Sequence, residues 1–248
     1  MKDRIYNDYF LPDRMDDYEK LLKSYLDNNY NFICIKDYKK MKDDKRYIFI
    51  RHDIDSDVKI AKKMFEVEKS LGVHSTFYFR LETFDKKLIQ EILNFGSEVG
   101  YHYEEIATYC KKKREFTKDF VFKNILDIQD LFIKNINDIQ EKYNIKLSSI
   151  AAHGDFVNRK IDISNQDLFT EELKKKLKLI EAYDIEKDID FRTSDCMYPK
   201  FFKDDPLKGC KEGKKKVLLL IHTRYWGRNP FERFKLDFKR FVGLIKYH

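Results

Sequence analysis

Short apolar runs that end in histidine or acidic side chains recur along this chain, and helical patterns separate them. The first run, residues 47–50, leads directly into Arg51, His52, Asp53 and Asp55. Later runs of strand-forming residues cover positions 75–80, 98–101, 148–152 and 217–221. An apolar strand that carries ionisable groups at its carboxyl end is how a parallel α/β fold presents chemistry, because the strand fixes those groups and the loop exposes them. The alternation therefore predicts an α/β fold with a parallel sheet and right-handed crossovers, and it places a candidate active site at 47–57.

Helical patterns fill the segments between these runs. Residues 58–71 are expected to form a helix that Ser56 or Asp57 caps and Gly72 stops. Further helices are expected at 86–94, at 116–143, at 166–178 and over the closing segment that carries Phe231, Phe234, Phe238, Phe241 and Ile245. Residues 180–195 divide into two short strands, and residues 1–46 form a capping segment with a helical pattern at 18–26 and a strand at 32–35. No linker composition interrupts the chain, so residues 1–248 are expected to form a single domain.

Composition and charge argue against several classes of protein. The 50 lysines and arginines exceed the 43 acids and give a net charge of +7, but most are interleaved with acids, and the dense runs at 111–114, 174–176 and 214–216 are typical of solvated faces. We therefore expect no nucleic-acid partner. No run approaches the roughly 20 apolar residues of a membrane span, and the charged N-terminus lacks the apolar core of a secretory signal, which favours a cytoplasmic protein. The four cysteines form no CxxC pair, so a zinc-finger or redox site is not expected.

Four of the six histidines lie at the carboxyl ends of predicted strands: His52, His102, His153 and His222. In a barrel of parallel strands these ends meet at one mouth. Imidazoles beside carboxylates are the groups that hold a divalent metal ion in many enzymes. His52 alternates away from Asp53 along its strand, so we expect it to pack or to support the site rather than to bind metal.

The order of the motifs resembles a known family. RHDID at 51–55, STFYF at 75–79, GSEVGYHYE at 96–104, AAHG at 151–154 and LLLIHTRYW at 218–226 resemble the polysaccharide deacetylase family, which has the NodB-homology fold and is also called carbohydrate esterase family four. The resemblance implies a distorted (β/α)₇ barrel that uses a divalent metal, usually zinc, to remove acetyl groups from N-acetylated or O-acetylated sugars. The HTRYW continuation is similar to a subgroup associated with surface-polysaccharide biosynthesis.

The resemblance assigns roles to the residues at the strand ends. It makes Asp53 the catalytic base and Asp55 a metal ligand, and it puts His102 in the place of the first histidine of the family's His-x-x-x-His pair. His222 matches the histidine that acts as general acid. Asp195 is expected to orient His222.

Two family positions are not filled as expected. The second histidine of the pair falls on Ile106, which cannot bind metal, although a catalytic zinc has three protein ligands. We expect His153 to be the replacement, with Glu104 as the second choice. The AAHG motif lacks the arginine that pairs with the base, and Arg51 or Arg224 can take that role from a neighbouring strand.

A metal held by these residues would activate water and polarise an acetyl carbonyl, while Asp53 and His222 moved protons. Aromatic residues with flat faces for a sugar ring are Tyr101, Tyr103, Tyr225 and Trp226. Two other hypotheses remain: a catalytically silent barrel that binds carbohydrate or a protein partner, and a metal-independent amidase acting on small C–N substrates. Taken alone, the two aspartates can also simply cap the next helix or pair with Arg51. The sequence leaves the substrate, the native metal and the oligomeric state open.

Overall fold

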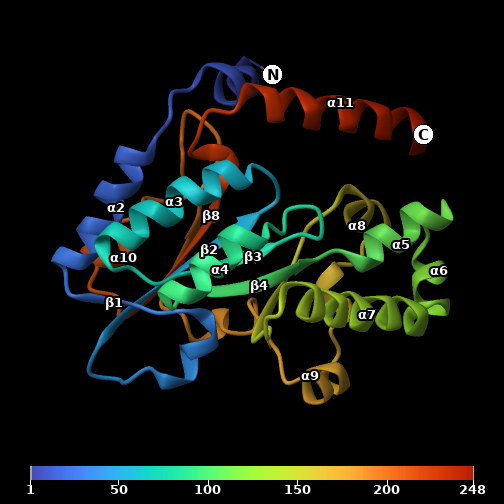
Figure 1. The fold of residues 1–248 in the computed structure, drawn as a ribbon, viewed down its shortest axis with the longest axis horizontal. Coiled ribbons are helices and arrows are strands. Elements are labelled where there is room, and N and C mark those ends of the chain that lie inside the picture. The colour runs from blue at the N-terminus through green and yellow to red at the C-terminus, as the bar shows by residue number, and fades with distance from the viewer. Residues whose placement is uncertain (1, 248) are drawn as a thin grey trace.

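A curved parallel sheet forms the centre of the molecule (Figure 1). The computed structural model describes the backbone of residues 2–247 and the side chains of residues 2–238. In spatial order the strands are β6 (Ile180–Glu181), β5 (Ser149–Ala152), β4 (Glu98–Tyr103), β3 (Thr76–Phe79), β2 (Arg46–Ile54), β8 (Lys216–His222) and β7 (Phe191–Ser194), and β1 (Tyr30–Phe32) pairs with the start of β2. Within the described chain no pairing joins β6 to β7, which would be neighbours in a closed ring. The predicted distorted (β/α)₇ barrel is therefore confirmed, in an incompletely closed form.

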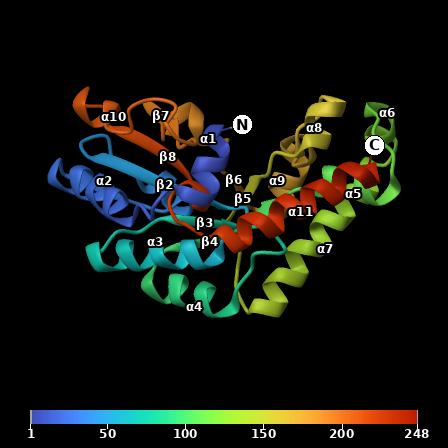
Figure 2. The same cartoon turned by 90° about the horizontal axis from the view of Figure 1, so that it is seen from above.

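Helices connect the strands along the outer side of the sheet, where Figure 2 shows α2, α3, α4 and α7. Their bounds are α1 (Lys2–Ile5), α2 (Met15–Asp27), α3 (Val58–Leu71), α4 (Lys86–Phe95), α5 (Glu105–Lys113), α6 (Lys118–Lys123), α7 (Ile125–Tyr143), α8 (Phe156–Ile161), α9 (Glu171–Leu177), α10 (Lys208–Lys211) and α11 (Pro230–Tyr247). Shorter turns are the π-helical η1 (Tyr6–Phe10) and the 3₁₀ segments η2 (Ile35–Lys40), η3 (Asn165–Leu168), η4 (Glu186–Asp188) and η5 (Thr223–Tyr225). Among these described elements, no helix has the length and apolar content needed to cross a lipid bilayer.

Several predicted elements differ in detail from the structure. Helix α3 has the predicted bounds and stops at Gly72 (φ 68°), but Asp57, whose backbone is left-handed (φ 56°), makes no capping bond and binds Arg233 instead. The predicted helix at 116–143 is split at Asn124, whose side-chain amide donates to Phe120 O at 2.8 Å and competes with the backbone. The predicted helix at 166–178 is also split, because the Thr170 side chain caps the N-terminus of a separate helix, α9. The strand expected at 32–35 lies instead at 30–32, and the two short strands at 180–195 are confirmed as β6 and β7.

Strand alternation divides the core into an inner and an outer part. On β2, Ile48 and Ile50 pack outward with the helices, whereas Phe49 packs inside the barrel with Tyr78 and Leu218. Because side chains alternate along a strand, Arg51, Asp53 and Asp55 continue the inward row that Phe49 begins.

Gly100 lets β4 pass the ring of Tyr78 inside the barrel. A Cβ at this position would lie 2.3 Å from Tyr78 Cε1 and 2.9 Å from Ser149 O. The same strand then delivers His102 and Glu104 on the inward face, two and four positions further along.

The closing helix is confirmed as α11, whose first turns lie beside α1 (Figures 1 and 2). Its phenylalanines Phe231, Phe234 and Phe238 are 76%, 65% and 60% exposed. The side chains of Phe241 and Ile245 lie outside the described residues.

Candidate metal centre and active site

The inward rows of four strands converge at the carboxyl end of the sheet. Asp53 and Asp55 come from β2 and the loop that follows it, His102 from β4, and His153 from the residue after β5. His222 ends β8 directly opposite Asp53 in the strand register. The structure therefore brings together the strand-end groups that the sequence singled out.

Asp55, His102 and His153 form a group that can hold a metal ion, because their ligand atoms lie within 4.8 Å of one another. Asp55 Oδ1 is 3.3 Å from His102 Nε2 and 3.4 Å from His153 Nε2. This oxygen is buried and has no hydrogen-bond partner. A buried acceptor without a donor is costly, and a cation between these groups would satisfy it.

The tautomer of His102 gives a second reason to expect a cation at this position. His102 Nδ1 lies 2.9 Å from the carbonyl oxygen of Ala151, which can only accept, so Nδ1 carries the hydrogen. In neutral His102, Nε2 then presents a lone pair to the carboxylates of Asp53 (3.4 Å) and Asp55 (3.3 Å). Acceptors that face one another are stabilised by a cation, and a set of two imidazoles and one carboxylate suits a catalytic zinc. The residues present fit a divalent metal.

Asp53 is held by Arg51 within the barrel. The guanidinium donates from Nε and Nη2 to the two carboxylate oxygens, both at 2.8 Å. Burial acts to raise the pKa of Asp53, but the charge and hydrogen bonds of Arg51, together with His102, outweigh it and hold that pKa below its ordinary value. Of Arg51 and Arg224, Arg51 is the one that pairs with this aspartate. Arg224 binds Asp8 of η1 instead, at 3.0 Å from its Nε.

His222 is fastened by Asp195, as expected. Asp195 Oδ1 lies 2.7 Å from His222 Nδ1, and Oδ2 accepts from the backbone N–H of His222 at 2.7 Å. The indole N–H of Trp226 also donates to Oδ2, at 2.9 Å. Burial alone would lower the pKa of His222, but the charge of Asp195 and its hydrogen bond raise that pKa to about 9. His222 is therefore protonated at neutral pH and has a proton to give.

Glu104 lies beside the metal group rather than within it. Its Oε1 accepts from Arg80 Nε at 3.1 Å and from Nη2 at 2.5 Å, and its Oε2 lies 3.2 Å from His153 Nδ1. Burial acts to raise the pKa of Glu104, but His153 and Arg80 lower it to about 2. Sequence reasoning missed Arg80, because an arginine that ends a strand such as STFYFR is ordinarily solvated.

Several further expectations concern side chains around the site. Tyr101, Tyr103 and Trp226 are 1%, 0% and 1% exposed and pack in the core, so the expectation that they present a face to a sugar is corrected. Tyr225 is half-buried, with its ring centroid 6.0 Å from that of His222.

Ile106 is fully buried against the core on α5 and cannot contribute to the site. His52 points outward and bonds Glu68 at 2.7 Å, which agrees with a packing role.

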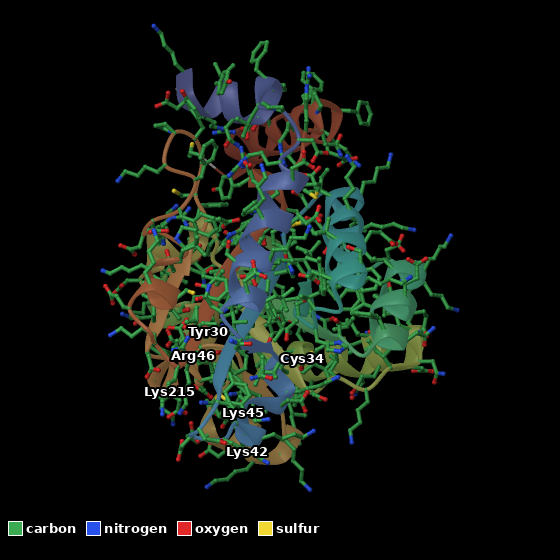
Figure 3. The ribbon with its side chains drawn as sticks, turned by 90° about the vertical axis from the view of Figure 1, so that its left-hand side faces the viewer. Tyr30, Cys34, Lys42, Lys45, Arg46 and Lys215 are labelled. Atoms are coloured by element: carbon green, nitrogen blue, oxygen red, sulfur yellow. The ribbon has the colours of Figure 1, made fainter. Side chains whose placement is uncertain are left out.

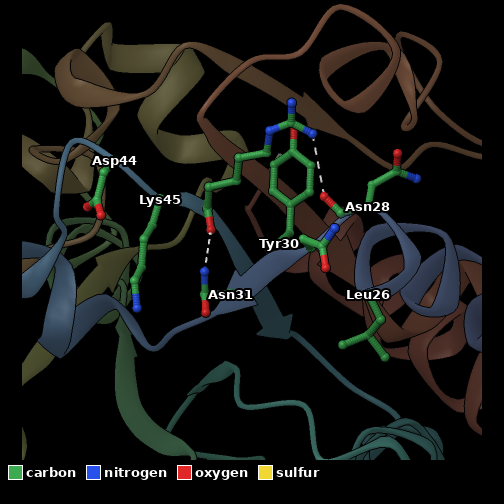
Figure 4. Close-up of a pocket in the computed structure, with 8 residues that line it drawn as sticks. Leu26, Asn28, Tyr30, Asn31, Asp44 and Lys45 are labelled. Atoms are coloured by element: carbon green, nitrogen blue, oxygen red, sulfur yellow. Dashed lines mark hydrogen bonds between the residues drawn. The ribbon is translucent and has the colours of Figure 1, made fainter.

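A hollow of about 670 Å³ lies at the other end of the sheet, around the starts of β1 and β2 (Figure 3). Figure 4 shows Tyr30, Asn31, Asp44 and Lys45 among the residues that line it. The Asn31 amide donates to the carbonyl oxygen of Arg46 at 2.9 Å, and the guanidinium of Arg46 lies 5.8 Å from the Tyr30 ring centroid. At about 3.3 Å per residue, Arg46 is roughly 30 Å along the chain from Asp55. The hollow shares no lining residue with the strand-end group.

Comparisons with known proteins return solved structures only. No protein-family model matches the chain, and no curated protein matches it. A family 4 carbohydrate esterase from Bacillus anthracis is similar at a TM-score of 0.44 and 12% identity, over 92% of this chain and 86% of that one. Peptidoglycan deacetylase PdaC from Bacillus subtilis is similar at 0.41 and 14%, over 80% and 87%. A CE4 family pseudoenzyme from Bacillus anthracis is similar at 0.43 and 12%, over 83% of this chain and 62% of its own, so this chain spans less than two thirds of that protein. Likeness at this level says nothing about the activity of this chain.

Proposed function

We propose that this protein is a metal-dependent hydrolase that removes acetyl groups from an N-acetylated or O-acetylated sugar, in surface-polysaccharide or glycan metabolism. The observation that carries the proposal is the convergence of two histidine Nε2 atoms on Asp55 Oδ1, a buried oxygen with no hydrogen-bond donor. On either side lie a carboxylate able to accept a proton and a histidine able to give one. The metal proposed for this donor set is zinc.

A divalent ion at this site would lower the pKa of a water from about 15.7 towards 7 and polarise the acetyl carbonyl. Asp53 would accept the proton of the attacking water, because its lowered pKa keeps it ionised and Arg51 fixes its orientation. His222 would donate a proton to the departing amine or alkoxide, since Asp195 keeps its pKa near 9. Tyr225 lies beside His222 and offers an accessible ring to a sugar.

Two departures from the family pattern favoured a catalytically silent barrel: the isoleucine at position 106 and the missing arginine of the AAHG motif. In each case another residue lies close enough to take the missing role. His153 could supply a third donor where Ile106 cannot, and Arg51 pairs with Asp53 where the AAHG motif has no arginine. These contacts favour a working site over a silent one.

The test combines metal binding with acetate release. Protein purified without added metal is titrated with zinc and with cobalt, and acetate release is followed on N-acetylated and O-acetylated oligosaccharides before and after chelation. Asp55→Asn and His153→Asn are expected to lose both metal and activity. His74→Asn, which changes a histidine two residues before β3, is the matched control and is expected to change neither.

Protein that remains empty after titration would contradict the proposal. Metal binding without acetate release on any substrate would instead favour a carbohydrate-binding or partner-binding barrel. Hydrolysis of a small C–N substrate that survives chelation would favour the amidase.

A further inference from the structure

Three neighbouring strands deliver Arg80, Glu104 and His153 side by side at the barrel mouth. Arg80 follows β3, Glu104 follows β4 and His153 follows β5. All three side chains are largely buried, with exposures of 17%, 17% and 15%. The contacts run in a chain from the guanidinium through the carboxylate to the imidazole.

The two histidines of the metal group each have an oxygen beside Nδ1. His102 Nδ1 hydrogen-bonds the carbonyl oxygen of Ala151 at 2.9 Å, whereas His153 Nδ1 lies 3.2 Å from Glu104 Oε2, within ion-pair distance but outside hydrogen-bond geometry. Neither His153 Nδ1 nor Glu104 Oε2 has a hydrogen-bond partner elsewhere among the described residues. Both partners are acceptor oxygens, because Ala151 presents a backbone carbonyl and Glu104 a carboxylate whose other oxygen accepts from two donors of Arg80. Each partner oxygen therefore favours the histidine tautomer that carries its hydrogen on Nδ1 and points its Nε2 lone pair toward Asp55.

Arg80 orients Glu104 toward His153 and balances the charge of its carboxylate. It occupies Glu104 Oε1 with two donors, so only Oε2 is turned to His153, and it neutralises a carboxylate that would otherwise add charge near Asp55. Its Nη1 also donates to the backbone oxygen of Asp55 at 3.3 Å, which ties the ligand loop to the same side chain.

We propose that Arg80 and Glu104 are a positioning pair that fixes the ring and tautomer of His153 so that its Nε2 is available to a divalent metal. The proposal rests on the metal site of the proposed function. Neither residue touches the metal or the substrate. Partners of this kind orient a ligand and are worth about 10- to 100-fold in metal affinity in other proteins.

Glutamine and alanine at position 104 separate positioning from packing. In Glu104→Gln the amide oxygen is drawn to the two Arg80 donors, which leaves the NH₂ group facing His153 Nδ1. An NH₂ group there needs a lone pair on Nδ1, so the hydrogen moves to Nε2 and the ring can no longer bind metal through that atom. Glu104→Ala leaves Nδ1 without a partner and both tautomers open. We therefore expect Glu104→Gln to weaken zinc and cobalt binding about 10- to 100-fold, more than Glu104→Ala does.

The matched control is Glu82→Gln. Glu82 also contacts Arg80, at 2.9 Å from Nη1, but its carboxylate is 40% exposed, and the same change of charge there should leave metal affinity within about twofold of the wild type. The double variant Arg80→Met with Glu104→Gln frees the amide to turn its oxygen to His153, so it should recover affinity relative to Glu104→Gln alone.

The tautomer of His153 is measured directly on metal-free protein by long-range ¹H–¹⁵N NMR, at a pH where the ring is neutral. The wild type is expected to carry the hydrogen on Nδ1 and Glu104→Gln on Nε2. An unchanged tautomer in Glu104→Gln, or alanine weakening metal binding more than glutamine, would overturn the positioning role. If the wild type binds no metal, the proposed function fails, and the tautomer measurement still decides this inference.

Discussion

Arg51 and Asp53 lie two positions apart on β2 and form a bidentate ion pair inside the barrel, with both contacts at 2.8 Å. Alternation along the strand places both side chains on the inward face, and each is almost completely buried, at 1% and 3% exposure. The guanidinium also lies 4.3 Å from the ring centroid of Tyr183. A single strand thus supplies both the candidate base and the cation that fixes it.

Replacing Asp53 with asparagine tests its role as base. The amide keeps the shape of the carboxylate but cannot take a proton, so we expect kcat for acetate release to fall about 10²- to 10⁴-fold. Zinc affinity, measured by competition with a chromogenic chelator, should change little because Asp53 is not among the three proposed ligands. Unchanged acetate release by metal-loaded protein would show that another group is the base.

Replacing Arg51 with methionine tests the buried ion pair. The change leaves the Asp53 carboxylate buried without its counter-charge, and breaking such a pair costs about 3–5 kcal/mol in the free energy of unfolding. Denaturant unfolding of the single variant is compared with the double variant that also carries Asp53→Asn. The double variant should recover part of the loss, because the uncompensated charge is gone; equal destabilisation of both variants would argue against the ion pair as the cause.

The strand-end groups could be predicted because they depend on local pattern. An apolar run fixes a strand, alternation fixes which side chains share a face, and parallel strands bring their carboxyl ends together. Asp53, Asp55, His102 and His222 follow from these rules, and the same geometry favours His153 over Glu104 as the third ligand.

Partners distant in the sequence could not be predicted in this way. Arg224 binds Asp8, which is 216 residues away, and no local sequence pattern predicts that contact. Trp226 follows a strand end and has the composition of a sugar platform, yet packing against Tyr18 and Phe202 buries it. Arg80 ends an aromatic run, where an arginine is ordinarily solvated, and only the neighbouring strand shows that it holds Glu104.

The pH dependence of activity should reflect the pair formed by His222 and Asp195. The pKa of His222 is raised from 6.5 to about 9, so the pair's contribution to stability is complete below pH 6.5 and is lost as the pH rises through about 9. As a general acid, His222 works only when protonated, and kcat/KM should therefore fall above pH 9. Asp195→Asn removes the charge that raises this pKa, and it should move the alkaline fall to lower pH. A fall at the same pH in both proteins would exclude His222 as its origin.

Ile106 provides a test that separates folding from metal binding. Its side chain is fully buried in the core, and Ile106→Ala should lower the free energy of unfolding by about 2–5 kcal/mol. Zinc affinity should remain at the wild-type value when measured well below the unfolding midpoint, because Ile106 is not among the three residues proposed to hold the metal. A large loss of affinity in folded Ile106→Ala protein would mean that α5 shapes the metal group.

Trp226 distinguishes a sugar platform from a support for the acid. Its indole donates to Asp195 Oδ2 at 2.9 Å, and its ring is 1% exposed. Trp226→Phe removes that donor and part of the buried volume, so we expect a loss of about 1–3 kcal/mol in unfolding free energy, together with a lower kcat. KM for the sugar should not change, because the ring is buried beneath the surface. Tyr225→Ala is the comparison, and it should raise KM because Tyr225 is the accessible ring beside His222. If Trp226→Phe raised KM while leaving kcat unchanged, the indole would have to become exposed to substrate during catalysis, and its assignment as a support for Asp195 would be wrong.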